Sequence, residues 1–236
     1  MMGKKVVRCV FALSLWLLLC HSSAHSQEAS GVVWKINLPT AQTPMARWLS
    51  ANSYIHTKGD ISRWQVGDGV LYMEAVDDSC EIDVQFPAPI PMVPPKKMVM
   101  TYQVASAPQG ADMRKAELQD SAFRVYVGFD KLVKQYLFGF IPKQIPNSLV
   151  YAHGTGERKG DEFQAPRFSN IFFHVVSDGT GKEWITVERD LGADYQRHFG
   201  AAPPPPIIGL KIKIDSNNTH GASRTRLKTL EIRERH

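Results

Sequence analysis

Apolar and polar residues alternate along short segments of this chain, and no segment after the first 26 residues shows a sustained helical period. The clearest example is LKIKID at 210–215, where three apolar side chains fall on one face of a strand and two lysines on the other. An antiparallel sheet with one buried and one wet face produces this pattern. We therefore expect four buried side chains and two exposed ones, which are Leu210, Ile212, Ile214 and Phe172, and Lys211 and Lys213.

About ten such segments, rich in β-branched and aromatic residues, are separated by glycine, proline, asparagine and aspartate. Strands that follow one another without intervening helices pack as two sheets. We expect an all-β fold, an antiparallel β-sandwich of jelly-roll type, formed by residues 27–236 as a single domain. One short helix is expected at residues 193–199, closed by Gly200.

The first 26 residues have the composition of a secretion signal. Three basic residues precede an apolar run at 10–19, which is shorter than the roughly twenty residues needed to span a membrane. A small-x-small triplet at 24–26 suits cleavage, so we expect a periplasmic or secreted protein with no transmembrane segment after the signal is removed. The alternatives are an uncleaved membrane anchor and a lipoprotein modified at Cys20.

The charge balance argues against nucleic acid as a partner. The chain holds 28 basic and 23 acidic residues, and removal of the signal leaves 25 against 23. The remaining positive charges are scattered, so they do not form the basic stripe that a phosphate backbone requires.

Cys80 is the one cysteine outside the predicted signal, so the mature chain has no internal disulfide. About 210 residues are enough to bury a hydrophobic core without one. A lone cysteine in an alternating apolar strand is typical of a packed, unreactive thiol, although a catalytic thiol is the alternative.

Sequence motifs of several known chemistries are absent. There is no phosphate-binding loop, no H-E-x-x-H or C-x-x-C metal motif and no G-x-S-x-G nucleophile elbow. The histidines are not spaced to make a local metal pair. A nucleophile–histidine triad is left open, because its members need not be near one another in sequence.

The segment EIDVQF at 81–86 places Glu81, Asp83 and Gln85 on one face of a strand. It resembles a strand of laminarinase-like sandwich enzymes, in which three carboxylates alternate. Here the third position is an amide, which cannot hold or transfer a proton, so one carboxylate of a retaining pair is missing. We interpret these residues as an outward polar face rather than as a catalytic set.

Several segments resemble a bacterial family catalogued only as domain of unknown function 3047. A D-x-x-x-R-V-Y-V strand is followed by a tryptophan strand, an E-R-x-x-x-x-D-Y segment, a phenylalanine-glycine pair and an Asp/Asn turn. The matching residues are Asp120, Arg124, Val125, Tyr126, Val127, Trp184, Glu188, Arg189, Asp194, Tyr195, Phe199, Gly200 and the turn 215–219. The sequence departs from the family pattern at Asn217, usually an aspartate, and at Tyr102, in a strand usually rich in tryptophan. The resemblance implies a sandwich fold and export, and implies no established activity.

Polar residues in these segments are the candidates for binding a ligand. Charged residues gather where a strand is expected to meet the helix, and Arg189 there can form bidentate hydrogen bonds. The alternative interpretation is a local ion-pair network that fixes the helix to the sheet. The candidate ligand-binding residues are Asp120, Arg124, Glu188, Arg189, Asp194 and Tyr195.

The turn after the LKIKID strand is a candidate calcium site. Asp215, Asn217 and Asn218 supply oxygen ligands within one turn, which suits calcium. Asparagine and aspartate also hydrogen-bond to their own backbone in turns, and that would leave a plain turn. Calcium is therefore the one cofactor that the sequence suggests.

These observations favour an exported binding module without catalytic activity, for a carbohydrate or another polar ligand of the cell envelope. One alternative is a polysaccharide hydrolase that uses carboxylates such as Glu188 and Asp194 in a cleft of the sandwich. Another is a structural or partner-binding protein of an envelope assembly, which should expose a large apolar patch. The sequence does not identify the ligand or the oligomeric state.

The signal predicts that the mature protein begins at Gln27. The intact mass of the exported protein should equal that of residues 27–236. A mass that retains Met1, or that includes acyl chains on Cys20, would contradict this prediction.

Overall fold

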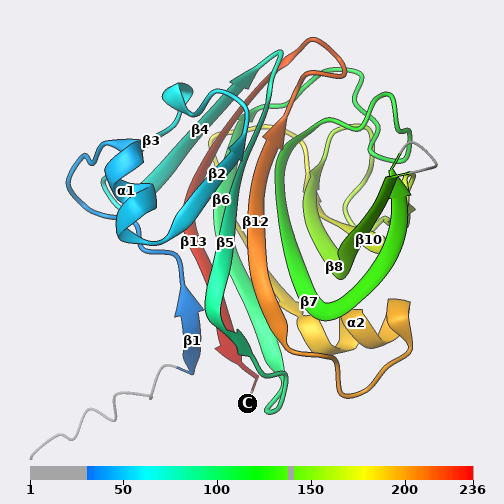
Figure 1. Cartoon of the computed structure of the whole chain (residues 1–236). Coiled ribbons are helices and arrows are strands. Elements are labelled where there is room, and N and C mark those ends of the chain that lie inside the picture. The colour runs from blue at the N-terminus through cyan, green and yellow to red at the C-terminus, as the bar shows by residue number, and fades with distance from the viewer. Residues whose placement is uncertain (1–30, 138–140, 236) are drawn as a thin grey trace, which may run out of the picture. The chain divides into compact units, whose positions relative to one another are not determined.

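Two β-sheets pack face to face in a computed structural model that describes residues 31–137 and 141–235 (Figure 1). The six-stranded sheet has the order β11-β6-β13-β4-β3, with β1 also paired to β13. Its strands are β1 (Val32–Lys35), β3 (Gln65–Gly67), β4 (Val70–Val76), β6 (Lys96–Ser106), β11 (Ile185–Asp190) and β13 (Ala222–Glu234). The seven-stranded sheet has the order β2-β5-β12-β7-β8-β10-β9. Its strands are β2 (Tyr54–Lys58), β5 (Ser79–Ile90), β7 (Ser121–Leu137), β8 (Ile141–Gly154), β9 (Glu162–Ala165), β10 (Phe168–Asp178) and β12 (Ile207–Asp215).

Within the described residues the paired strands are antiparallel, except that β8 and β10 run parallel. The parallel pair arises because β9 forms the sheet edge and pairs antiparallel with β10, which lies between β9 and β8. The predicted β-sandwich is confirmed, with this one departure from purely antiparallel pairing.

Two α-helices accompany the sheets in the described part of the chain, where the sequence predicts one. They are α1 (Met45–Ala51) and α2 (Leu191–Phe199), and a short 3-10 helix η1 (Ile61–Arg63) adds a turn. The predicted helix corresponds to α2, which begins earlier because Asp190 accepts hydrogen bonds of 3.0 Å from the N–H groups of Gly192 and Ala193. Gly200 ends it with a φ of 68°. The sequence does not predict α1, because its seven residues are too few to show a helical period.

Apolar side chains from the inner faces of both sheets meet in one main core. Leu210, Ile212 and Ile214 are buried as predicted, and Phe172 is half-buried against the same core. Cys80 is also buried, and burial raises the pKa of its thiol to about 12. A thiol with such a pKa is packed and unreactive at neutral pH, as its place in the strand suggests.

The prediction that Lys211 and Lys213 are exposed is wrong. Their side chains are 34% and 15% exposed, respectively. Both line the pocket on the outer face of the seven-stranded sheet. The long strands β7 and β8 curl round so that this face is concave (Figure 1). The lysines are covered because they lie within this curve and pair with neighbouring carboxylates, whereas a flat sheet would expose them.

A second, smaller apolar cluster lies on the outer face of the same sheet. Its buried members are Met113, Val150, Ala152, Ala165, Ile171, Phe173 and Val175. Met113 belongs to the segment between β6 and β7, and the carboxylate of Glu157 accepts hydrogen bonds from its N–H group and from that of Thr155. This segment therefore covers one part of the concave face and leaves another part open.

The predicted signal peptide, residues 1–26, and its cleavage before Gln27 lie outside the described residues. Residues from Gly31 onward group into a single unit. No helix in the described part of the chain is long and apolar enough to cross a membrane.

A buried polar chain links Tyr102, Ser177 and His153 inside the fold. The Tyr102 and Ser177 hydroxyls form a hydrogen bond, and His153 Nδ1 lies 2.8 Å from Ser177 Oγ. Burial lowers the pKa of His153 from 6.5 to about 4. Between these pH values the unfolded chain takes up a proton that the folded protein does not accept.

We expect His153 to lower the free energy of unfolding by about 3 kcal/mol as the pH falls from 6.5 to 4, and to have no such effect above pH 6.5. Urea unfolding at several pH values measures this loss of stability. Between pH 6.5 and 4 the free energy of unfolding of His153→Gln should fall by about 3 kcal/mol less than that of the wild type. The exposed His220→Gln serves as the control and should keep the wild-type pH dependence. Equal pH dependence in the wild type and His153→Gln would contradict the prediction.

Candidate functional site

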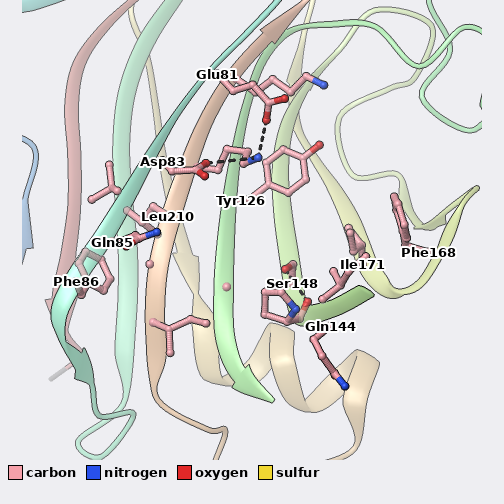
Figure 2. A pocket seen from close by; sticks show the side chains of 18 of the residues that line it. Glu81, Asp83, Gln85, Phe86, Tyr126, Gln144, Ser148, Phe168, Ile171 and Leu210 are labelled. Carbon is pink, nitrogen blue, oxygen red and sulfur yellow. Dashed lines mark hydrogen bonds and ion pairs between the residues drawn. The ribbon is translucent and has the colours of Figure 1, made fainter. Parts of the chain in front are cut away.

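The open part of the concave face forms a pocket of about 620 Å³ (Figure 2). Its walls come from β5, β12, β7, β8 and β10, the inner strands of the seven-stranded sheet. Small-molecule sites in proteins have volumes of about 300–1,000 Å³. The pocket is therefore large enough for a small organic ligand.

Strand register brings the charged residues of the pocket side by side. Lys211 of β12 pairs with Asp83 of β5 on one side and with Tyr126 of β7 on the other. Residues two apart on a strand share a face, so Glu81 and Gln85 flank Asp83 on the pocket side. Figure 2 shows Glu81, Asp83 and Tyr126 around a lysine nitrogen that contacts both carboxylates.

Lys211 connects the two carboxylates of β5. Its Nζ donates a hydrogen bond of 2.6 Å to Glu81 Oε2 and lies 3.4 Å from Asp83 Oδ1. Burial alone would raise the pKa of Glu81, but the hydrogen bond from Lys211 and the charges of Lys213 and Lys211 outweigh it and lower the pKa. Burial alone would lower the pKa of Lys211, but the bond to Glu81 raises it. Both groups therefore stay charged at neutral pH.

A second ionic group adjoins the first. Asp215 Oδ2 accepts a 2.5 Å hydrogen bond from Arg124 and lies 2.7 Å from Lys213 Nζ. The side chains of Arg124 and Asp215 are only 1% and 5% exposed. Burial alone would raise the pKa of Asp215, but the charges of Arg124 and Lys213 outweigh it and lower the pKa. The buried charges are tolerated because they are paired, and they hold Lys213 at the pocket wall.

The two ionic groups balance each other. The negative charges are those of Glu81, Asp83 and Asp215, and the positive charges are those of Arg124, Lys211 and Lys213. The exposed Lys143 adds one positive charge to the lining. The pocket therefore offers many hydrogen-bonding groups and little net charge.

Neutral groups complete the walls. Gln85, Gln144 and Ser148 supply hydrogen-bond donors and acceptors, and Phe168 adds an aromatic ring at the other side of the pocket (Figure 2). Burial raises the pKa of Tyr126, so its hydroxyl keeps its proton at neutral pH. The lining thus combines polar groups with aromatic surface.

Glu81 is poorly suited to act as a general acid. A general acid must hold a proton at working pH, which needs a raised pKa, whereas the pKa of Glu81 is lowered. Gln85, the third residue on this face, has no titratable group. The Oδ1 atom of Asp83 faces Lys211 at 3.4 Å and makes no hydrogen bond with the described residues, so it keeps acceptor capacity for a ligand. The lowered pKa of Glu81 therefore argues against its use as a general acid.

The six residues predicted to bind a ligand are spread over β11, α2 and the region of β7, and the side chains of Asp120 and Arg124 are buried. Asp120 is fully buried and accepts hydrogen bonds from the backbone N–H groups of Asn218 and Thr219, at 3.1 and 2.7 Å. Arg124 belongs to the buried pair with Asp215. Neither side chain lines the pocket.

The other four predicted residues lie on β11 and α2. Glu188 is exposed on the six-stranded sheet, where it pairs with a lysine of β6 at 2.9 Å. Arg189 donates hydrogen bonds of 2.9 and 2.7 Å to the two carboxylate oxygens of Asp194, and the Tyr195 hydroxyl accepts one of 3.0 Å from Asn147. These contacts match the alternative interpretation of an ion-pair network, and ligand binding by these residues stays a prediction.

The three predicted calcium ligands make separate contacts. The Asp215 carboxylate already faces an arginine and a lysine, and their positive charges would repel a calcium ion. Asn217 is exposed, and the side-chain amide of Asn218 donates a 3.1 Å hydrogen bond to the carbonyl of Glu117. Calcium binding at this turn stays a prediction that these contacts do not favour.

Sequence reasoning placed Glu81, Asp83 and Gln85 on one face but assigned them no site, and it missed Lys211 and Tyr126. A usable signal was present, because acidic residues alternate on one strand and lysines on another. Opposite charges at such spacing are typical of neighbouring strands. The pattern does not show which strand lies beside which in the sheet.

A family model with the description "Protein of unknown function (DUF3047)" matches residues 56–231. No curated protein sequence matches this chain significantly.

Three solved structures are similar to this chain at low sequence identity. The xyloglucanase domain of NopAA from Sinorhizobium fredii, in complex with cellobiose, is 6% identical with a TM-score of 0.46, over 86% of this chain and 99% of that one. The carbohydrate recognition domain of Emp46p is 8% identical with a TM-score of 0.44, over 87% and 97%. The exoplasmic/lumenal domain of VIP36 in its Ca²⁺-bound form is 9% identical with a TM-score of 0.42, over 86% and 90%. Likeness at this level gives no basis for assigning their ligands or activities to this chain.

Replacing Lys211 by methionine tests the ion pairs of the pocket. Methionine keeps an apolar stem but removes the cation between Glu81 and Asp83. We expect the free energy of unfolding at pH 7 to fall by about 1–2 kcal/mol, a value discounted because the lysine is about one-third exposed. The folded-state pKa of Glu81 is lowered, so the stability from this pair is present above its unfolded-state pKa and is lost as the pH falls through the folded-state pKa.

Urea unfolding of the wild type and Lys211→Met should therefore differ most at pH 7 and converge in acid. Lys97→Met is the matched control, because it breaks an ion pair with the exposed Glu188 on the other sheet and should have a smaller effect. A Lys211→Met variant as stable as the wild type at pH 7 would contradict the prediction.

Proposed function

The chain belongs to the DUF3047 family of proteins of unknown function, and we propose that its concave-face pocket binds a carbohydrate or another neutral polar ligand without catalysing a reaction. The observation that carries the proposal is that positive and negative side chains of the pocket wall are paired with each other, next to neutral hydrogen-bonding groups. Such a wall suits a ligand with many hydroxyl groups, because hydroxyls both donate and accept hydrogen bonds.

The charge balance disfavours two other ligand classes. A phosphorylated or polyanionic ligand needs uncompensated arginine or lysine, whereas Lys211 and Lys213 already face carboxylates. A polycationic ligand needs free carboxylates, whereas Glu81 is already bonded to Lys211. A neutral ligand avoids both conflicts.

The aromatic residues of the wall support the same ligand class. Tyr126 is half-buried near the two carboxylates, and Phe168 lies across the pocket (Figure 2). An aromatic ring presents an apolar surface beside the polar groups, and a sugar ring presents C–H groups beside its hydroxyls. Ser148 and Gln144 belong to β8, which lies between the strand of Tyr126 and the strand of Phe168. There they can form hydrogen bonds with the polar groups of the ligand.

The secretion signal predicted at residues 1–26 supports a role outside the cytoplasm. Polysaccharides and glycans are abundant in the cell envelope, so an exported module with a polyol-binding pocket would meet this class of ligand there. Periplasmic or secreted localisation is part of the proposal.

Binding of neutral oligosaccharides to the mature protein tests the function. A glycan array that carries neutral, acidic and amino sugars should show retention of neutral ones, and calorimetry should then give the Kd. Asp83→Asn should weaken binding about tenfold or more, because it removes the charge of an acceptor in the pocket wall. Tyr126→Phe should weaken it less, because the ring is kept.

Glu188→Gln is the control, because it removes an exposed carboxylate from the other sheet and should leave the Kd unchanged. If Glu188→Gln loses affinity and Asp83→Asn keeps it, the ligand does not bind in the concave-face pocket. Release of reducing ends from a bound polysaccharide by the wild type would contradict the non-catalytic assignment.

A further inference from the structure

Three residues from separate elements meet at the junction of β9, β10 and α2. Glu162 lies on β9, its pairing partner His174 on β10, and His198 on α2. Glu162 Oε1 is 3.1 Å from His174 Nδ1, and Glu162 Oε2 is 3.5 Å from His198 Nε2. One ligand atom from each residue lies within 4.8 Å of the other two.

These distances suit a tetrahedral metal ion. Zinc binds histidine nitrogen and carboxylate oxygen at about 2.0–2.2 Å, and a tetrahedron with such bonds separates its ligands by roughly 3.3 Å. Each histidine nitrogen lies near that distance from one of the two Glu162 oxygens, at 3.1 Å from Oε1 and 3.5 Å from Oε2, so the carboxylate reaches both imidazoles. Two imidazoles and one carboxylate leave a fourth position for water.

The histidine rings are held in place by stacking, and each has one nitrogen without a hydrogen bond to the described residues. His174 is buried and stacks on Tyr151 with ring centroids 5.3 Å apart, and His198 stacks on Phe172 at 4.4 Å. The Nε2 atoms of His174 and His198 are buried and make no hydrogen bond with the described residues. A buried nitrogen without a partner costs free energy, and a metal ion would supply a partner for the His198 Nε2 that faces Glu162.

Two arginines compete with a metal ion for this position. Arg197 contacts Glu162 Oε1 at 2.6 Å, and Arg189 lies 3.7 Å from the same oxygen and 3.2 Å from His174 Nδ1. The Arg197 side chain is 55% exposed, so it can move into solvent when a metal ion takes its place. Arg189 would keep its two hydrogen bonds to Asp194.

We propose that Glu162, His174 and His198 bind a divalent transition-metal ion, with zinc as the best match to this ligand set. The ion would tie α2 to the β9–β10 edge of the sheet. This site is separate from the concave-face pocket, because His174 and the pocket-lining Ile171 project from opposite faces of β10. The inference does not depend on the proposed function.

Calorimetric titration of the full mature chain with zinc chloride, after treatment with a chelator, tests the site. We expect one zinc ion per chain and a melting temperature that rises with zinc concentration. Glu162→Gln and His198→Gln, which change the more exposed ligands, should each weaken binding by about tenfold or more. Arg197→Gln should strengthen binding, because it removes the cation that competes for Glu162.

His220→Gln changes an exposed histidine outside the cluster and should bind zinc like the wild type. The visible spectrum of cobalt in place of zinc reports the coordination geometry without relying on stability, and should be tetrahedral. Zinc binding that is unchanged in both Glu162→Gln and His198→Gln, or weaker in Arg197→Gln, would overturn the proposal. So would an octahedral cobalt spectrum identical to that of the free ion.

Discussion

The position of β12 between β5 and β7 determines what the seven-stranded sheet presents on each face. Backbone hydrogen bonds on both sides fix the register, so Ile212 lies between Ile82 and Val125 while Lys211 lies between Asp83 and Tyr126. A slip of one residue would turn the lysines into the core and the isoleucines into the pocket. The cost of burying unpaired lysines excludes that arrangement, so the packing of the core and the chemistry of the pocket are specified together.

The sequence predicted those features of the fold that are local. Alternation along LKIKID gave the buried face of β12, and Gly200 marked the end of α2, because a strand period and a helix cap are contained in a few residues. The curvature of the sheet is not contained in any one strand. The exposure predicted for Lys211 and Lys213 was therefore wrong, and the polar face of Glu81 and Asp83 was recognised without its role as a pocket wall.

The candidate sites also depend on contacts between residues that are far apart in sequence. Polar residues of the family-like segments, such as Asp120 and Asn218, hydrogen-bond to backbone groups of turns that lie far away in sequence. Glu162, His174 and His198 are spread along the chain and meet only because β9 folds back on β10 and α2 packs beside them. No spacing rule within a single element could identify that cluster.

The buried Cys80 has a practical consequence for how this protein can be handled. It is a free thiol, and the described residues contain no other cysteine, so reducing agents have no covalent cross-link to break within this part of the fold. Folding there is indifferent to the redox potential of its compartment. A cysteine introduced on the surface would also be the one readily alkylated thiol of the described region, which suits site-specific attachment of fluorescent or spin labels.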